Sequence, residues 1–346
     1  GASNVAMGSN ALGANTTASN NVAIGFRTLQ SNTTGTSNVA VGASAALSNQ
    51  TGSDNAVFGH QAMQTNTTGG SNSAFGRYAL LNNSTASFNT AVGRSALQEN
   101  TTASNNTAVG YRALYLNTTG ANNTSIGHDT LKANTTGTSN QAIGIGALEN
   151  LTTGNNNVAI GVLAGAYTTL LTTGSQNVLI GHVVHTSAAD TTYAVGIGYN
   201  LSCAGGYTTL GQDSTDSRLA HGGTTWATVS DERYKKDIVD STAGLSFINA
   251  LRPRTFKYRT LGELPETFSA YEADSTEVFK NSETNHGFIA QEIKAAIDAD
   301  ASIKDGFRLW DDREDGSQEV AEAALIPVLV KAIQELTARL ETLEGK

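Results

Sequence analysis

The sequence predicts a mainly β repeat rod built from seventeen-residue β-roll or solenoid coils and associated as a trimer, followed by an α+β domain that ends in a coiled-coil helix. Glycines recur every seventeen residues along the first part of the chain, and each follows the same pair of apolar residues. Charge is concentrated at the other end: residues 1–220 hold 6 Lys+Arg and 7 Asp+Glu, whereas residues 221–346 hold 15 and 23. We therefore predict solenoid repeats over 1–200, a transition or tip region over 201–229 and a separate domain over 230–346.

The repeat reads N-x-A-Φ-G-x-x-A-L-x-x-N-T-T, where Φ is a large apolar residue. A coil of this size cannot bury its own apolar face, so we expect the coils to stack. At about 4.8 Å per coil, twelve coils would make a rod roughly 55 to 60 Å long. The repeat is anchored on Gly8, Gly25, Gly42, Gly59, Gly76, Gly93, Gly110, Gly127, Gly144 and Gly161, with less regular copies at Gly181 and Gly198.

Two short strands are expected in each coil, one around the "VAIG" segment and one around the "xxAL" segment. The residue before the glycine is large, as at Ile24, and the residue before that is usually small, as at Ala23. Because adjacent strand residues face opposite sides, we expect one face to fill a core and the small-residue face to approach another backbone closely. Both faces should then be buried, with the small-residue face associating side by side and three chains around one axis.

Two columns of asparagine accompany the repeat. The column that includes Asn89 and Asn106 stands four residues before the glycine, and its stacked amides should form a ladder between coils. The column that includes Asn100 and Asn117 belongs to N-T-T segments and is interpreted as turn chemistry. Many N-T-T segments also match the glycosylation sequon, which a tract built from such turns produces automatically.

Other classes of site find little support in the sequence. The nearly neutral repeat region does not resemble a nucleic-acid-binding surface, and no apolar run reaches the eighteen or so residues of a membrane helix. The only cysteine, Cys203, cannot form an intrachain disulfide, and His182 with His185 has no further metal ligand nearby. We expect no cofactor and no metal. Because the chain begins inside a repeat, we also expect an upstream attachment region.

Two resemblances follow from these motifs. The repeat of residues 1–200 resembles the left-handed β-roll heads of trimeric autotransporter adhesins and the shafts of bacteriophage tail fibres. The segments "SDERYKKDI" (230–238), "LRPRTFKYR" (251–259), "HGFIAQEI" (286–293) and "LIPVLVKAIQEL" (325–336) occur in the order seen in the endosialidase-type intramolecular chaperone domain. That domain ends many phage tail spikes and fibres and is a self-cleaving peptidase.

The resemblance implies a catalytic Ser-Lys dyad at Ser230 and Lys235 and a cut at the Val229–Ser230 bond. A serine hydroxyl becomes a good nucleophile when a base takes its proton, and an amine is such a base only when uncharged. Without the resemblance, the S-x-x-x-x-K spacing of Ser230 and Lys235 favours an exposed turn over a catalytic pair. We expect Asp231 and Arg233 to support the loop.

Two further motifs of the C-terminal domain carry expectations. In "HGFIAQE", residues His286, Gln291 and Glu292 are interpreted as a helix N-terminus and its packing in preference to direct catalysis. The last segment has apolar residues at alternating spacings of three and four, which predicts a short coiled coil. Its apolar positions are Ile326, Leu329, Ile333, Leu336, Leu340 and Leu343, with Pro327 in the first turn.

The predicted function is a phage tail-fibre or tail-spike segment, folded in the host bacterial cytoplasm and carried in the virion. Its C-terminal domain would drive homotrimer formation and then cleave itself off. The partner would be a bacterial surface glycan or protein, and the region from about Leu171 to Thr228, where the period breaks, offers receptor contacts or a capping transition. Candidate receptor-binding residues are Tyr193, Tyr199, Tyr207, His221 and Trp226.

The alternatives come from other classes of protein. A trimeric bacterial surface adhesin shares the repeat, and a glycan-depolymerising spike shares the chaperone. The repeat tract has few carboxylates and no recognisable acid/base pair, which disfavours the depolymerase. An ice-binding protein is disfavoured because the threonines lie in turns beside Asn and Gly.

Overall fold

The computed structural model describes residues 1–213, 215–228, 230, 232–300, 303, 309–313 and 315–345. The chain forms two compact units, Gly1–Asp231 and Glu232–Lys346.

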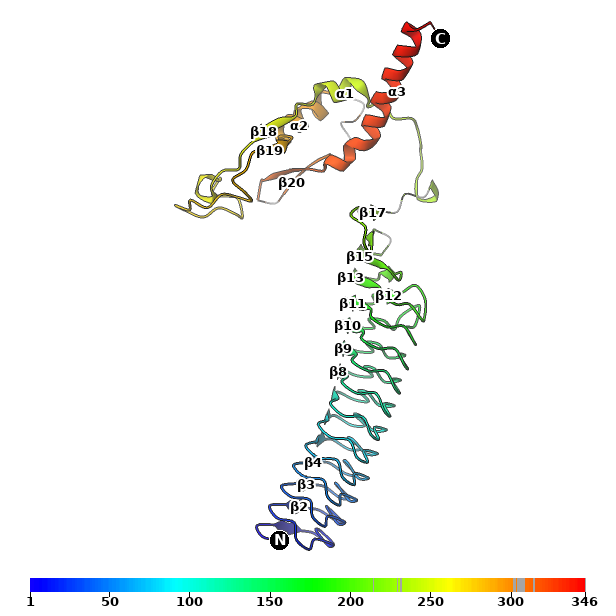
Figure 1. Ribbon diagram of the computed structural model, residues 1–346, viewed down its shortest axis with the longest axis vertical. Coiled ribbons are helices and arrows are strands. Elements are labelled where there is room, and N and C mark those ends of the chain that lie inside the picture. Colours follow the sequence, from blue (N-terminus) through cyan, green and yellow to red (C-terminus); the bar gives the residue numbers. More distant parts are fainter. Residues whose placement is uncertain are drawn as a thin grey trace. The chain divides into compact units, whose positions relative to one another are not determined.

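The first unit is a β-solenoid of about 12 turns with seventeen-residue coils, which confirms the predicted repeat architecture (Figure 1). Each regular coil contributes one three-residue strand to a parallel sheet, and neighbouring strands pair in register, as in Ala23↔Ala40. The strands are β1 (Val5–Met7), β2 (Val22–Ile24), β3 (Val39–Val41), β4 (Ala56–Phe58), β5 (Ser73–Phe75), β6 (Thr90–Val92), β7 (Thr107–Val109), β8 (Thr124–Ile126), β9 (Gln141–Ile143), β10 (Val158–Ile160) and β11 (Val178–Ile180).

The prediction of a second strand in each coil, around "xxAL", is wrong. These residues form turns, in which left-handed residues alternate with others, as at Arg27 (φ 56°) and Leu29 (φ 50°). The backbone still bonds between coils, since the Leu29 N–H donates to the Ala45 carbonyl at 3.1 Å. An extended strand is excluded because alternating left-handed residues curl the chain back across a narrow coil.

The interior of each coil is filled by the small column and the leucine column. Ala91 and Leu97 are both 0% exposed. The large residues before the glycines point outward instead, so the expectation that both strand faces are buried, with the small face outermost, is wrong in the single chain. The inward strand position is alanine in most coils, but Val57, Ser125 and Leu179 occupy it in others and are also 0% exposed, so the narrow interior is filled mainly by small side chains packed beside the leucine column.

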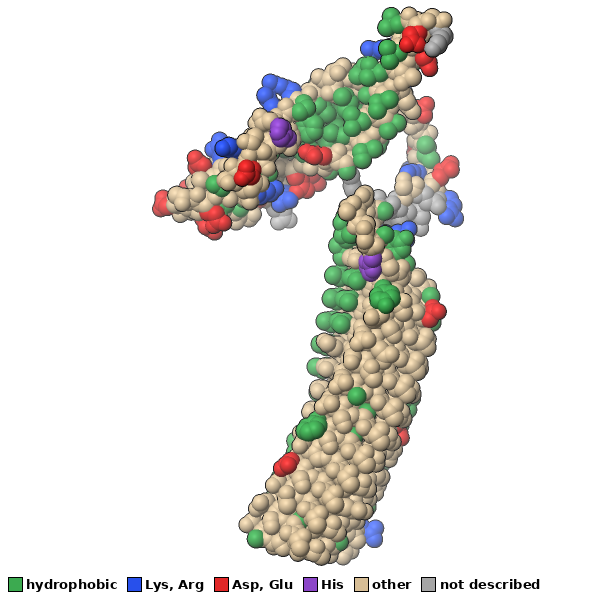
Figure 2. All heavy atoms as spheres, in the orientation of Figure 1, with side chains coloured by type: hydrophobic (Ala, Val, Ile, Leu, Met, Phe, Trp, Pro, Cys, Tyr) green, Lys and Arg blue, Asp and Glu red, His purple; other side chains and the backbone are tan. Residues whose placement is uncertain are grey.

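We call the outward row of large apolar residues the outer stripe. Figure 2 shows part of it as hydrophobic side chains along one edge of the stack. Its members are Met7, Ile24, Val41, Phe58, Phe75, Val92, Val109, Ile126, Ile143, Ile160, Ile180 and Ile197.

The close backbone approach occurs at the repeat glycine and not at the alanine. Gly93 has a φ of 132°, and a Cβ placed there would lie 2.4 Å from the carbonyl oxygen of Gly110. Neither the conformation nor the distance allows a side chain, so the glycine column is required for coils to stack.

Both asparagine columns bond between coils. In the first column the regular donor is the main chain: the Asn106 N–H donates to Oδ1 of Asn89 at 2.9 Å. In the second column the side chains form the ladder, with Nδ2 of Asn100 donating to Oδ1 of Asn83 at 2.9 Å and to the Ala103 carbonyl of its own turn at 3.0 Å. The turn interpretation is confirmed, but the sequence analysis missed this second ladder. Asn100 is 0% exposed, which leaves its amide inaccessible to glycosylation in the folded rod.

The stack continues through an irregular end. An insertion lengthens the step from Asn157 to Asn177 to twenty residues, yet β11 still pairs in register with β13 (Val195–Tyr199). The sheet then passes to β15 (Tyr207–Gln212), β16 (Ser217–Ala220) and β17 (Ala227–Thr228), the last two antiparallel, beside a small β12 (His185–Thr186) and β14 (Ser202–Cys203) pair.

The second unit combines short helices and two-stranded sheets with a long final helix. The sheets are β18–β19 and β20–β21, both antiparallel. Its elements are η1 (Glu232–Tyr234), α1 (Leu245–Ala250), β18 (Arg254–Phe256), η2 (Leu261–Glu263), β19 (Asn285–Gly287), α2 (Ala290–Ala299), β20 (Trp310–Asp312), β21 (Gln318–Val320), η3 (Glu322–Ala324) and α3 (Leu325–Leu343).

The long helix α3 has one buried and one uncovered apolar face. Leu325, Val328 and Ala332 are buried in the unit, the first two in a core with Phe247 and Ile293. The six residues predicted for the coiled coil form the row that adjoins the buried one around the helix and are 43% to 84% exposed, and hydrophobic side chains are visible along the helix in Figure 2. Among the described residues, no helix is long and apolar enough to cross a membrane.

The second asparagine ladder makes a stability prediction. Asn100→Ala removes two donated hydrogen bonds and the acceptor of the bond from Asn117, and it leaves buried polar groups without partners. We expect a loss of about 1 to 3 kcal/mol, seen as a lower midpoint of thermal unfolding by circular dichroism. Thr102→Ala, at an exposed position of the same N-T-T turn, should change the midpoint little. Equal midpoints for the two variants would show that the ladder does not stabilise the rod.

Candidate functional site

The predicted dyad lies where the two units meet in the sequence. Strand β17 ends at Thr228, Ser230 follows, and the 3₁₀ turn η1 separates it from Lys235. The Lys235 N–H donates to the Glu232 carbonyl at 2.9 Å and closes that turn, and the side chains of Ser230 and Lys235 are exposed.

The division between the units falls between Ser230 and Lys235. Each is therefore placed only within its own unit. Val229 and Asp231 lie outside the described residues, and Arg233 lies exposed within η1. The dyad and the cleavage bond stay predictions.

Two of the sequence motifs pair directly in the second unit. Strand β18 comes from "LRPRTFKYR" and β19 from "HGFIAQEI", and they are antiparallel with Thr255 opposite His286. Helix α2 begins at Ala290, directly after β19, which puts Gln291 and Glu292 in its first turn. The helix start expected in this motif is confirmed.

A bidentate ion pair joins the same two motifs. Arg254 donates from Nε to Oε2 of Glu292 at 2.9 Å and from Nη2 to Oε1, and Arg252 lies 3.5 Å from Oε1. The hydrogen bonds from Arg254 hold the pKa of Glu292 below its ordinary value, and the bond to Glu292 raises the pKa of Arg254. These partners explain Glu292 as a residue that holds β18 to the start of α2.

The sequence analysis missed Arg252 and Arg254. The signal was present in the basic "RPR" of the second motif, but only the fold shows which carboxylate these arginines bind.

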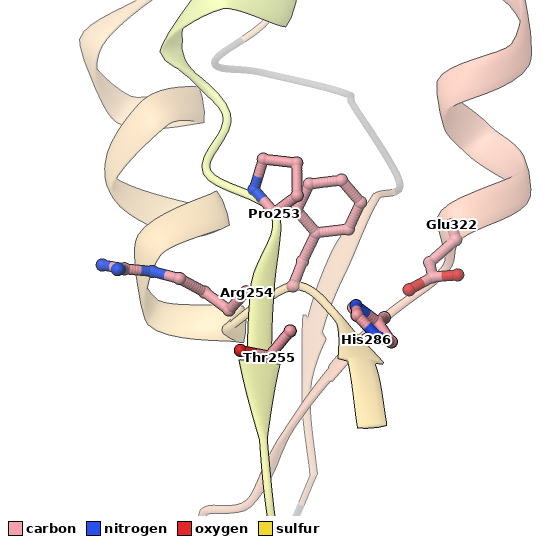
Figure 3. A pocket seen from close by; sticks show the side chains of 7 residues that line it. Pro253, Arg254, Thr255, His286 and Glu322 are labelled. Atoms are coloured by element: carbon pink, nitrogen blue, oxygen red, sulfur yellow. The ribbon is translucent and has the colours of Figure 1, made fainter. Parts of the chain in front are cut away.

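A cavity of about 430 Å³ opens beside the β18–β19 pair (Figure 3). Figure 3 shows His286 and Glu322 on one side of it, with the Arg254 side chain pointing away across α2. Its lining consists of Pro253, Arg254, Thr255, His286, Gly287, Phe288 and Glu322. A neighbouring hollow of about 820 Å³ shares His286 and also includes Gln291, so both motif residues border open space.

The candidate receptor residues lie at the irregular end of the stack. Tyr193, Tyr199 and Trp226 are each about half exposed, at 55%, 48% and 45%. Tyr207 opens β15 with the guanidinium of Arg218 5.2 Å from its ring centre, and His221 is exposed just after β16. The structure brings Tyr207 and His221 to the same strand pair, and their binding role stays a prediction.

The two histidines considered for a metal have other contacts. The ring of His182 stacks on Tyr199 with centres 5.4 Å apart, whereas Nε2 of His185 lies 2.9 Å from the Thr168 hydroxyl and Nδ1 lies 3.0 Å from the Val183 carbonyl. In the part of the chain that the structure describes, no group of three or more His, Cys, Asp or Glu could hold a metal ion. Burial raises the pKa of the Cys203 thiol to about 11, which makes it a poor nucleophile.

Comparison with known proteins gives one family match, in the C-terminal part of the chain. Residues 230–301 match the family described as "Chaperone of endosialidase", and the match begins at the motif serine. No curated protein and no solved structure matches the chain. This family is the self-cleaving intramolecular chaperone, and its match, together with a solenoid of seventeen-residue coils, fits a tail fibre with a C-terminal chaperone.

The Arg254–Glu292 pair predicts a pH dependence. Because the pKa of Glu292 is lower in the folded state than in the unfolded state, the pair stabilises the second unit above the unfolded-state pKa and the effect is lost as pH falls through the folded-state pKa. Glu292→Gln should therefore lower the unfolding midpoint of this unit at pH 7, and the difference from wild type should shrink as the pH falls below about 4. Chemical denaturation at several pH values measures it. Glu266→Gln, at an exposed position of the same unit, is the control; a difference from wild type that is the same at every pH would contradict the role given to the pair.

Proposed function

We propose that this chain is a segment of a phage tail fibre or tail spike that attaches the virion to a bacterial surface, and that its C-terminal domain assembles three copies and then removes itself. The observation that carries the proposal is the order of the two parts: a chaperone-family segment begins at Ser230, directly after the last strand of the solenoid. A folding chaperone covalently joined to a repeat rod has the rod as its substrate.

The rod presents a folding problem that such a domain relieves. In the regular repeats, each inner strand pairs with the strands of the coils before and after it, so these contacts join residues seventeen positions apart and leave strand edges open until stacking is complete. Holding the C-termini of three chains together raises the local concentration of the repeats and aligns the chains.

Helix α3 offers the surface for this first association. Its outward apolar residues repeat at coiled-coil spacing over about three heptads, and 62% of the Ile333 surface is exposed in the single chain. Such a row is stabilised when copies of the same helix pack together. Three copies match the stoichiometry that the resemblance implies.

Cleavage would follow by attack of the Ser230 hydroxyl on the Val229 carbonyl carbon. Uncharged Lys235 takes the hydroxyl proton, the Val229–Ser230 amide bond breaks as an ester forms on Oγ, and the proton passes to the released amine of Ser230. Water then hydrolyses the ester and leaves a new carboxylate at Val229. Lysine acts as a base only without its charge, which burial favours. Lys235 is exposed in the single chain, so we propose that assembly around the junction activates it.

Release of the chaperone would make the folded rod long-lived, because the domain that aligned the chains is gone and the rod unfolds only over a high barrier. We further propose that the chain folds in the cytoplasm of the host bacterium and is joined to the tail through an upstream region. The exposed aromatic residues at the irregular end of the stack would contact a surface glycan or protein.

The dyad predicts a specific pattern of cutting. Wild type should yield fragments of 229 and 117 residues of the 346 on a denaturing gel, with masses that place the cut before Ser230. Ser230→Ala and Lys235→Arg should stay uncut, because the first lacks the nucleophile and the second has a side chain that stays protonated. Lys236→Arg, one residue further on, should cut like wild type. Cutting by Lys235→Arg would remove the general base from the proposal.

Helix α3 predicts that assembly precedes cutting. Ile333→Asp places a charge in the outward apolar row and should convert trimers to monomers in light-scattering measurements, with at least a tenfold slower appearance of the fragments. Gln334→Asp adds the same charge at the adjacent exposed position and should assemble and cut like wild type. A monomeric Ile333→Asp chain that cuts at the normal rate would separate the two steps and refute the coupling.

A further inference from the structure

The outer stripe is a long apolar surface that the single chain leaves half covered. Between Phe75 and Ile160, five of its members are 38% to 41% exposed. The covered part comes from neighbours in the stripe itself: the rings of Phe58 and Phe75 stack with centres 4.9 Å apart and planes 8° apart. The remaining surface faces away from the coil and finds no partner within it.

We propose that the outer stripe is the surface along which copies of this chain pack against one another, parallel and in register, over the length of the rod. This inference rests on the proposed assembly of copies and adds which face of the solenoid they share. The outer stripe takes the place of the small-residue face that the sequence predicted as the contact surface, since Ala91 and its equivalents are enclosed inside the coils.

The spacing of the stripe favours a second copy over an unrelated partner. The stripe presents one large side chain per coil, and in-register strand pairing repeats them at about 4.8 Å. A partner that contacts every layer needs the same repeat distance along its whole length. Another copy of the solenoid has that repeat, and a parallel, in-register arrangement lets each layer meet its own equivalent.

The size and the edge of the stripe fit such an interface. Seven of the twelve side chains are 38% to 65% exposed and the other five are partly exposed, which leaves on the order of 800 Å² uncovered, more than the largest apolar patch of a typical monomer and close to one partner's share of a stable interface. Two residues further along each coil, an outward column is mixed: it carries Arg77, Arg94 and His128 in some coils and the apolar Phe26, Ile145 and Val162 in others. Exposed apolar residues accompanied by arginine and aromatic residues are typical of protein interfaces.

Cysteine cross-linking of the full chain tests the proposal. Val41→Cys and Ile160→Cys each place one thiol on the stripe, near opposite ends of the regular stack. With a short bismaleimide, each variant should give a band of two linked chains, at least tenfold stronger than that of Thr119→Cys, whose thiol lies in an exposed N-T-T turn. Wild type is the blank, because Cys203 is fully buried.

Each outcome decides between arrangements, with the mass of the uncross-linked protein measured alongside. Links between like thiols at both positions support parallel, in-register packing. Links that form only when the Val41→Cys and Ile160→Cys chains are mixed indicate an antiparallel arrangement and overturn the proposal. Trimers without links also overturn it while leaving the proposed function intact, and a monomeric wild type would overturn both.

Discussion

Hydrogen bonding from each coil to the next is the constraint on which the rest of the rod depends. Seventeen residues cannot enclose a core of their own, so each coil relies on the layers on either side to cover its leucine and alanine and to satisfy its backbone. The glycine column allows the coils to approach, since a Cβ at Gly93 would strike the Gly110 carbonyl. The amides of Asn83, Asn100 and Asn117 then occupy the remaining buried polar positions and donate to one another.

This dependence explains why such a rod would be joined to a chaperone. A coil that has not yet stacked has neither a closed core nor paired strand edges, so partly stacked chains expose surfaces that pair with the wrong partner. The terminal helix α3 does not depend on stacked repeats for its own core contacts. It is anchored through Leu325 and Val328 in the core of the second unit, while the adjoining apolar row stays uncovered. A second unit that folds independently can therefore present that row before the repeats have stacked.

The fold was largely predictable because individual residue types recur at the same position of every seventeen-residue repeat. Glycine, alanine and asparagine each mark a separate geometric need, and the apolar spacing of the last segment placed both α3 and its outward face. Two features escaped prediction. The turn at "xxAL" depends on left-handed leucines such as Leu29, a conformation that leucine rarely adopts and that no local pattern announces. Which face of the strand points inward depends on coil width, and alternation alone leaves that choice open.

The candidate site shows a different limit. A motif can point to Ser230 and Lys235 as a proposed dyad because that chemistry requires those residue types, whereas the partner of Arg254 is defined only once β18 lies against α2. The spacing of residues along the sequence does not predict such long-range contacts. The same distinction applies to activation of the lysine. Ser230, two residues beyond the end of β17, and Lys235, just beyond η1, belong to different units of one chain, so under the proposed mechanism a base that functions only when sheltered from water would respond to assembly as well as to its own sequence. The time at which the chain is cut would then depend on the assembly of the copies, and the motif of a single chain would not be enough to predict it.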